Sequence, residues 1–251
     1  MDTLVFQPVE HIGTDKRSIL YKGLSGVGKT HNALTWPGKK LLLYFDRNME
    51  TINTFIDGGA DLERYEPKDW KEIDTQFIPA IEHRELKCET IILDTLDTFS
   101  QWLAGETEGP GGKMNIDLWG KLKRRHRALF SALASAIQFR EGLPNYNFVC
   151  TTHIQDFTSG SGDNSTVLAR RQPKTEGGFR EEVEGMFDTV LLCESEVKNI
   201  MEKGRKAGAE KLYYCHSVAP SALDSCKSKG LPARVGGTYP ELLDAWKGDK
   251  K

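Results

Sequence analysis

The sequence has few cysteines, and they form no pattern typical of metal binding or disulfides. The five cysteines are an odd number without a close pair, which excludes a zinc ribbon and a disulfide framework. Cys150, Cys193 and Cys215 lie in apolar runs that predict strands, so we expect buried thiols in a reducing compartment. The N-terminus has no basic flank followed by an apolar segment, and no apolar run reaches the roughly 18 residues that span a membrane. These absences predict a cytoplasmic protein with no membrane partner.

Positive and negative side chains are nearly equal in number. The chain has 34 Lys and Arg against 36 Asp and Glu, a formal net charge of -2, which argues against a global attraction to nucleic acid. A local basic patch is compatible with this balance, because acidic residues elsewhere cancel it. With 251 residues, 38% of them hydrophobic, the chain is long enough for one large α/β domain. We expect a single domain over 1–251, with residues 1–17 as an N-terminal extension.

Short apolar runs alternate with longer amphipathic segments, which predicts βαβ units and a mainly parallel sheet. We expect strands at 18–22, 41–45, 90–93, 147–151, 188–193 and 211–217. We expect helices at about 28–36, 67–85, 117–141 and 239–247. The stretches 104–115 and 156–178 are rich in glycine or polar residues and are expected to be irregular. A loop as long as the second one is generally functional or disordered inside a compact domain.

The segment GLSGVGKT, Gly23 to Thr30, matches the phosphate-binding pattern G-x-x-x-x-G-K-[ST]. It follows a β-branched and aromatic run and precedes a helical stretch. This strand–loop–helix context favours a phosphate-binding loop over the alternative, an ordinary glycine-rich turn. Backbone N–H groups and the helix N-terminus would hold phosphate oxygens. Lys29 would reach the β- and γ-phosphates, and the Thr30 hydroxyl would bind Mg²⁺. The predicted nucleotide-binding residues are Gly23, Ser25, Gly26, Val27, Gly28, Lys29, Thr30 and His31.

The run TIILD, Thr90 to Asp94, predicts the second half of this site. A buried strand that ends in a carboxylate can hold Mg²⁺ through water, so Thr30 and Asp94 are the expected metal residues. Taken alone, such an Asp is as well explained as a helix cap or turn residue. Asp94 is followed by Thr95 and not by Glu, so the carboxylate pair common in AAA+ motors is missing.

Three further residues are candidates for catalysis beside Lys29. The strand at 41–45 leads into Asp46, with Glu50 just after it, and either carboxylate could orient water at the γ-phosphate. NFVCTTH places His153 at the carboxyl end of another strand, where ligand-facing groups gather in open parallel sheets. We therefore expect His153 to sense the γ-phosphate; the alternative is an exposed or capping histidine.

The order of these motifs resembles the RecA-like ATPases of phages, particularly the RecA-core single-strand annealing proteins and their AAA-type phage nucleotide-binding relatives. The resemblance extends over about residues 17 to 247. It implies a RecA-like P-loop NTPase fold, a mainly parallel central sheet flanked by helices, with a β-rich C-terminal part. It also implies an ATPase that uses ATP and Mg²⁺ and acts on single-stranded DNA in recombination or strand annealing. A homo-oligomer, ring or filament, and a place in the host cytoplasm are expected with it.

The chain departs from this family at one position. In such proteins the second strand generally ends in Asp-x-Glu, whose Glu is the catalytic base. The corresponding residues here are Asp46, Arg47 and Asn48, so Asn stands at the Glu position. Either Glu50 or Asp46 takes over the role, or hydrolysis is slow or DNA-stimulated.

The family also tends to contact DNA through a mobile loop after the sensor strand. The corresponding loop, 154–178, carries Arg170, Arg171 and Lys174, although acidic residues follow it. The basic side of the helix at 117–141, from Lys121 to Arg127 with Arg124 and Arg125, is a second candidate. Phe157 or Phe179 could stack a base. Lys227 and Lys229 are candidates for completing the ATP site of a neighbouring subunit, unless they are ordinary turn lysines.

Two other functions remain open at the level of sequence. One is a non-catalytic nucleotide switch that recruits replication or recombination partners, which Asn48 supports. The other is a small-molecule P-loop kinase, which would need an arginine-rich lid that the sequence after Asp94 does not offer.

Overall fold

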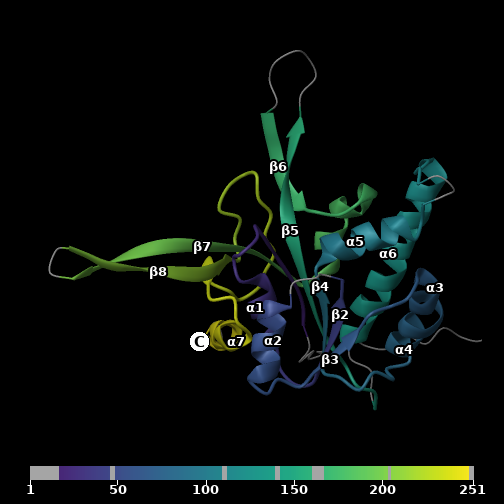
Figure 1. Ribbon diagram of the computed structural model, residues 1–251, viewed down its shortest axis with the longest axis horizontal. Coiled ribbons are helices and arrows are strands. Elements are labelled where there is room, and N and C mark those ends of the chain that lie inside the picture. The colour runs from purple at the N-terminus through teal and green to yellow at the C-terminus, as the bar shows by residue number, and fades with distance from the viewer. Residues whose placement is uncertain are drawn as a thin grey trace, which may run out of the picture.

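The computed structural model describes residues 17–45, 49–108, 112–138, 142–159, 167–202 and 205–248. In these residues a nine-stranded sheet is flanked by helices on both faces, and two long β-ribbons project from the body in different directions (Figure 1). No helix in these ranges is long and apolar enough to cross a membrane.

The central sheet is mainly parallel, as predicted. Its strands follow the order β3-β2-β4-β5-β1-β7-β8-β9, and β6 pairs only with β5. Neighbours from β3 to β7 run parallel, whereas β8 and β9 are antiparallel additions. The bounds are β1 Ser18–Gly23, β2 Lys40–Tyr44, β3 Leu62–Tyr65, β4 Thr90–Asp94, β5 Asn147–Ser159, β6 Val167–Pro173, β7 Thr189–Glu202, β8 Arg205–His216 and β9 Arg234–Val235.

The helices lie between these strands in the chain and cover both faces of the sheet. Their bounds are α1 Lys29–Leu34, α2 Glu50–Asp57, α3 Trp70–Glu72, α4 Ile78–Glu82, α5 Leu96–Gly105, α6 Ile116–Ile137 and α7 Tyr239–Gly248. A π-helical turn, η1 Ile73–Phe77, joins α3 to α4, and 3-10 turns lie at η2 Gly177–Glu181 and η3 Val183–Met186. The predicted helix at 67–85 is therefore one interrupted helix.

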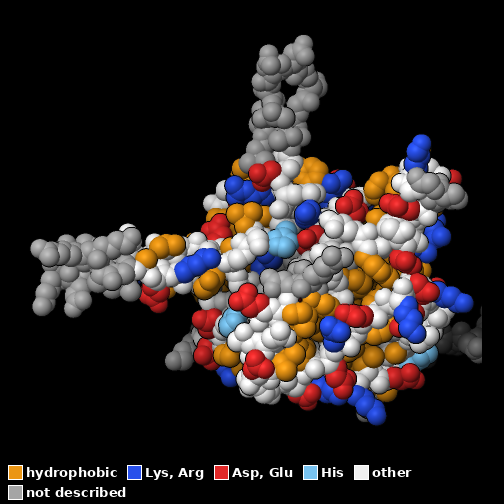
Figure 2. All heavy atoms as spheres, in the orientation of Figure 1, with side chains coloured by type: hydrophobic (Ala, Val, Ile, Leu, Met, Phe, Trp, Pro, Cys, Tyr) orange, Lys and Arg blue, Asp and Glu red, His pale blue; other side chains and the backbone are white. Residues whose placement is uncertain are grey.

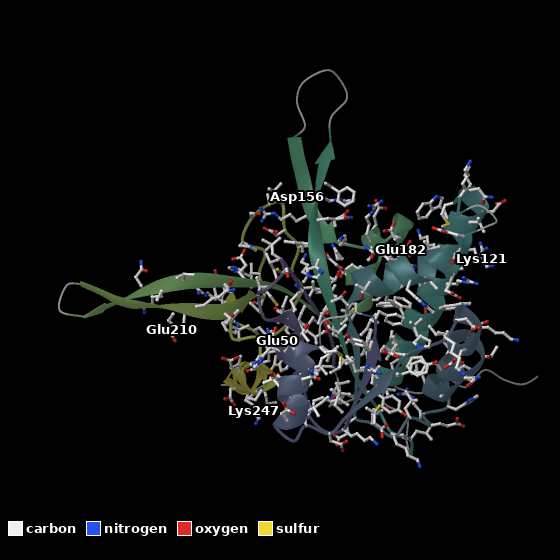
Figure 3. All side chains as sticks on the ribbon, viewed as in Figure 1. Glu50, Lys121, Asp156, Glu182, Glu210 and Lys247 are labelled. Carbon is white, nitrogen blue, oxygen red and sulfur yellow. The ribbon has the colours of Figure 1, made fainter. Side chains whose placement is uncertain are left out.

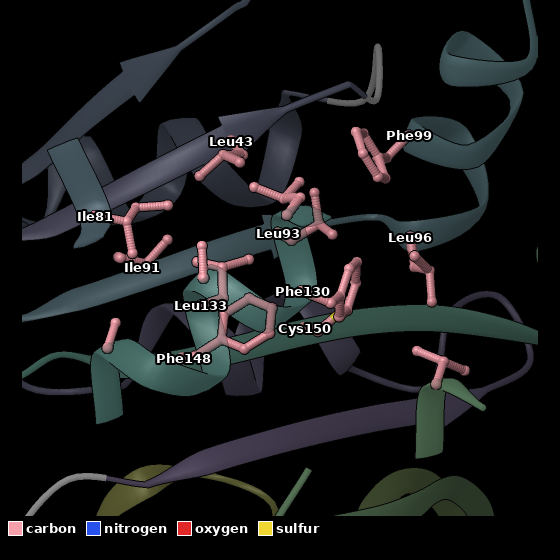
Figure 4. Close-up of a cluster of buried hydrophobic side chains, with 14 of the residues drawn as sticks. Leu43, Ile81, Ile91, Leu93, Leu96, Phe99, Phe130, Leu133, Phe148 and Cys150 are labelled. Atoms are coloured by element: carbon pink, nitrogen blue, oxygen red, sulfur yellow. The ribbon is translucent and has the colours of Figure 1, made fainter. Parts of the chain in front are cut away.

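Alternation along the strands divides the core into two layers. On β4, Ile91 and Leu93 pack into one hydrophobic cluster with α4, α5 and α6, whereas Ile92 faces the other cluster with α1, α2 and α7. Successive side chains of a strand point to opposite faces, so a sheet covered on both sides needs continuous apolar runs such as IIL. Figure 4 shows the first cluster, with Leu43, Phe130 and Phe148 between the sheet and α6.

The long helix α6 follows the predicted amphipathic pattern. Asn115 caps it by accepting a hydrogen bond from the Leu118 N–H at 2.9 Å. Leu122, Leu129 and Leu133 form the buried side of the helix.

The stretch expected to be an irregular loop, 156–178, proves to be largely regular in the residues described. β5 continues to Ser159, and β6 returns antiparallel beside it, with Asp156 opposite Arg171 and Gln155 opposite Gln172. Asp156 and Arg171 form an ion pair at 3.4 Å, a cross-strand contact that supports such a ribbon. The polar composition concealed these strands, because residues such as Asp156 and Arg170 are exposed on the ribbon. Residues 160–166 lie outside the described ranges.

The second ribbon also extends beyond its prediction. The strands expected at 188–193 and 211–217 are the inner ends of β7 and β8, which pair from Leu192 and His216 outward to Glu202 and Arg205. Buried apolar residues mark only the inner part, so the hydrophobic pattern ends where the ribbon leaves the body.

Candidate nucleotide-binding site

The phosphate-binding loop connects β1 to α1 at the carboxyl edge of the parallel sheet. Gly23 lies between two strands, and a Cβ atom there would approach the Cys193 carbonyl oxygen to 2.5 Å. Gly28, the residue before α1, has a φ of 86°, in the left-handed region that favours glycine. The loop therefore requires its glycines for close approach and for chain reversal, and it directs the N-terminus of α1 to its centre.

Lys29 lies inside this loop. Its Nζ donates hydrogen bonds to the carbonyl oxygens of Gly23 at 3.1 Å and Leu24 at 2.7 Å, and the residue is only 6% exposed. Burial lowers the pKa of Lys29, although nearby acidic groups such as Asp94 oppose this shift. A buried ammonium that bonds only to neutral carbonyls is suited to an incoming anion.

Asp94 is the centre of an oxygen-rich cluster. The Thr30 hydroxyl donates to its two carboxylate oxygens, at 3.2 Å to Oδ1 and 3.1 Å to Oδ2, and the Thr151 hydroxyl also donates to Oδ1. Asp94 is 3% exposed. A carboxylate and a hydroxyl are the hard oxygen donors that Mg²⁺ prefers. The predicted pair Thr30 and Asp94 is thus brought together, and Thr151 joins it because β5 lies beside β4.

The sensor candidate His153 lies next to the loop. It pairs in register with Gly23 on β1, and its Nδ1 is 2.9 Å from Asp97 Oδ2. Burial raises the pKa of Asp97, but the hydrogen bonds from His153 and Thr95 outweigh it, so the pKa is lowered overall. Asp97 is not among the site residues predicted from the sequence. Its signal was the spacing in Asp94-Thr95-Leu96-Asp97, which puts a second carboxylate in the first turn of α5.

A groove of about 670 Å³ lies beside the loop and is lined by Gly26 and Gly28. His31 and Phe55 meet edge to face with ring centroids 5.2 Å apart, and Tyr213 of β8 lines the same groove. The Lys211 Nζ donates to the Gly26 carbonyl oxygen at 2.9 Å and lies 5.1 Å from the Tyr213 ring. Thr30 and Asp94 mark the metal end of the loop, so this aromatic groove is placed for the nucleoside end of a bound nucleotide.

The structure describes one of the two other catalytic candidates, Glu50, and not Asp46. Asp46 falls in 46–48, outside the described residues. Glu50 is the first residue of α2 and lines the aromatic groove (Figure 3).

The two candidate trans-acting lysines lie in the segment before β9. The Lys227 Nζ donates to the Phe187 carbonyl oxygen at 2.7 Å, and its backbone pairs with Val190. Lys227 is therefore used within its own chain, whereas Lys229 is exposed.

The basic candidates differ in the contacts that they make. Arg170 is exposed and pairs with Glu181 at 3.3 Å, and Lys174 is exposed. Arg171 bridges Asp156 at 3.4 Å and Asp224 at 3.6 Å. Both arginines lie on the β5–β6 ribbon.

The basic side of α6 is partly structural. Arg125 donates to the Glu106 carbonyl oxygen at 2.9 Å and to the Thr107 hydroxyl at 2.8 Å, which ties α6 to the end of α5. Arg124 and Lys121 are exposed, and Figure 3 shows Lys121 on α6, well away from Glu50. Figure 2 shows that basic and acidic side chains alternate over the visible surface.

One aromatic candidate is excluded. Phe179 is fully buried and stacks on His126 with centroids 4.6 Å apart, so it cannot stack a base. Phe157 is partly buried, and the Arg180 guanidinium carbon lies 4.5 Å from its ring centroid.

The strand order, the phosphate-binding loop and the Thr30–Asp94 pair together define a P-loop NTPase of RecA-like fold. The chain belongs to the AAA domain family, whose model matches residues 15–220. It is similar in structure to the flagellar accessory protein FlaH from Methanocaldococcus jannaschii, with 11% sequence identity and a TM-score of 0.36. That match covers 87% of this chain and 83% of FlaH. No curated protein sequence matches the chain.

Proposed function

We propose that the chain is an ATPase that binds ATP with Mg²⁺ and acts on single-stranded DNA, in phage-type recombination or strand annealing. The observation that carries the nucleotide part is the buried Lys29 beside the Thr30–Asp94 pair. Lys29 and the loop amides would bind the β- and γ-phosphates, and Thr30 and Asp94 would hold Mg²⁺, which neutralises charge on the phosphates when bound. The groove of His31, Phe55 and Tyr213 would take the base.

His153 supports a link between nucleotide and DNA. It lies beside the phosphate-binding loop, and the same strand continues beyond it into the β5–β6 ribbon. If the His153 side chain responds to the γ-phosphate, its movement would therefore reach the inner end of the β5–β6 ribbon, which carries Arg170. Arg170, together with Lys174 at the foot of the ribbon, supplies the positive charge for a DNA backbone.

The test is ATP turnover measured with and without single-stranded DNA. The proposal expects turnover that depends on Mg²⁺ and rises when single strands are added. It also expects affinity for an oligonucleotide to fall by orders of magnitude between about 50 and 200 mM salt. Arg170→Gln should weaken binding, while Arg64→Gln, a change of an exposed arginine on β3, should not. No binding of single strands at low salt, with and without ATP, would contradict the DNA part.

A nucleotide switch is the second candidate, and one observation favours it. Glu50 lines the aromatic groove at the head of α2, and Asn48 stands where the family has its catalytic Glu. ATP binding without turnover, with or without DNA, would select the switch.

Assembly is part of the same proposal. A homo-oligomer, ring or filament, would place Lys229 of one subunit near the phosphate-binding loop of the next. Light scattering of the chain with and without a non-hydrolysable ATP analogue tests this, and a monomer under both conditions would contradict it.

A further inference from the structure

A cavity of about 370 Å³ lies beside Asp97, the partner of His153. α5, the first turn of α6, β5 and the segment 174–180 after β6 surround it. Six of the side chains that line it are Gln101, Trp119, Gln155, Lys174, Thr175 and Arg180. None of them takes part in the nucleotide site described above.

Trp119 gives this cavity an aromatic wall. The residue is 39% exposed, whereas Trp36, Trp70 and Trp246 are each 9% exposed or less. The backbone of Gly177 lies against its ring, since a Cβ atom on Gly177 would be 3.1 Å from the ring atom Cε3. Gly177 has a φ of 67°, so the close approach and the backbone conformation both favour glycine here. The indole is therefore held in place by backbone on one side while it lines an open cavity.

Thr175 supplies a polar group that lacks a partner. It is 6% exposed, and its hydroxyl has no hydrogen-bond partner among the described protein atoms. A buried hydroxyl without a partner costs free energy, and a ligand that bonded to it would recover that hydrogen bond. Gln101 and Gln155 add two amides, each able to donate and to accept along the edge of a base.

Charged residues of both signs line the cavity. Two carboxylates, Asp97 and Glu176, also line it and disfavour a phosphate inside. Lys174 is exposed, and Arg180 lies over the Phe157 ring at the foot of the β5–β6 ribbon. An aromatic ring, neutral amides and the cations Lys174 and Arg180 around one cavity are groups that can bind the base and the phosphate of a nucleotide.

We propose that this cavity binds one unstacked base of single-stranded DNA against Trp119. The inference rests on the proposed action on single strands and adds the place where a base is held. Asp97 lines the cavity and bonds to His153, which lies next to Gly23 of the phosphate-binding loop. A base in the cavity and a nucleotide in the loop thus contact the two ends of one hydrogen-bonded pair.

The test follows oligo(dT) binding in two ways, by anisotropy of a labelled oligonucleotide and by tryptophan fluorescence of the protein. Wild-type protein is expected to show fluorescence quenching upon binding. Trp119→Phe should keep affinity within about threefold but lose most of the quenching, since a phenyl ring still stacks. Trp119→Ala should weaken binding roughly tenfold. Thr175→Val, which keeps the shape and removes the hydroxyl, should weaken it severalfold.

Trp102→Phe is the matched control, because Trp102 packs against Phe45 and Phe99 outside the cavity. It should keep both affinity and quenching. If quenching persists in Trp119→Phe and affinity is unchanged in Trp119→Ala and Thr175→Val, the base pocket is wrong while DNA binding stands. If wild-type protein binds no single strand by anisotropy, the proposed function itself fails. ATP binding by each variant shows that the domain is folded.

Discussion

The Nδ1 of His153 lies 2.9 Å from the Asp97 carboxylate, and the His153 backbone N–H also donates to Asp97 at 3.3 Å. One carboxylate thus fixes both the main chain and the ring of His153, partway along β5. Asp97 itself belongs to the first turn of α5, the helix that follows Asp94. The pair connects the segment after the metal-binding strand to the strand that continues into the β5–β6 ribbon.

Asp97→Asn tests whether this pair transmits the nucleotide state. The change removes a charge-assisted hydrogen bond to His153, so we expect the stimulation of ATP turnover by single-stranded DNA to fall roughly tenfold. ATP affinity should stay within about threefold, because Lys29, Thr30 and Asp94 are unchanged. Asp117→Asn, at the first turn of α6, is the control and should behave as wild type. Full stimulation in Asp97→Asn would show that the pair is only structural.

Tyr213→Ala tests the aromatic groove as the site of the base. We expect ATP to bind roughly fivefold to tenfold more weakly, because the ring contributes stacking and apolar contact. Inorganic tripolyphosphate should bind both proteins equally, since the phosphate-binding loop is intact. Tyr214, the next residue on β8, points to the opposite face of the strand and provides the control Tyr214→Ala. An equal loss of affinity for ATP and tripolyphosphate would contradict the assignment.

His126 gives a prediction about stability and pH. Burial lowers its pKa to about 4, although a hydrogen bond to the Leu122 carbonyl oxygen opposes the shift. In the unfolded chain the pKa of this histidine is near 6.5, so the unfolded state binds the proton more readily. The free energy of unfolding therefore decreases as pH falls from about 6.5 to about 4. The loss is on the order of 3 kcal/mol.

Urea unfolding at pH 7 and pH 4.5 measures this effect for wild type and His126→Phe. The variant has no ring nitrogen to protonate, so its unfolding free energy should fall less between the two pH values. Both proteins share every carboxylate. The difference between their losses of unfolding free energy from pH 7 to pH 4.5 therefore isolates the contribution of His126. An equal loss of unfolding free energy in the two proteins would contradict the assignment of His126 as a buried, neutral histidine.

The sequence predicts the phosphate-binding loop and the strand before Asp94 because both are encoded locally. Gly23 to Thr30 is one continuous segment, and the run before Asp94 is apolar on both faces, as a buried parallel strand requires. The parallel sheet and the N-terminal P-loop helix follow from the same signals. The order of the strands places Thr151 near Asp94 and His153 near Asp97, and that neighbourhood depends on tertiary pairing that no single sequence shows.

The rest of the site comes from segments far apart in the chain. Tyr213 reaches Gly28 only because β8 folds back on β7, and Trp119 reaches Gly177 only because the segment after β6 crosses α6. The full length of the ribbons was not predicted, because their outer parts lack the apolar runs that indicate buried strands. Phe179 was misread as a candidate for stacking because its burial arises from α6 and not from its own neighbours in the sequence.

Equilibrium binding of ATP to Lys29→Ala, measured by calorimetry in the presence of Mg²⁺, tests the central claim most directly. Lys39→Ala, a change of an exposed lysine that pairs with Glu63, is the matched control. We expect wild type and Lys39→Ala to bind ATP alike, and Lys29→Ala to bind at least about tenfold more weakly, because it loses a charged donor to the phosphates. Unchanged ATP affinity in a folded Lys29→Ala protein would contradict the nucleotide site.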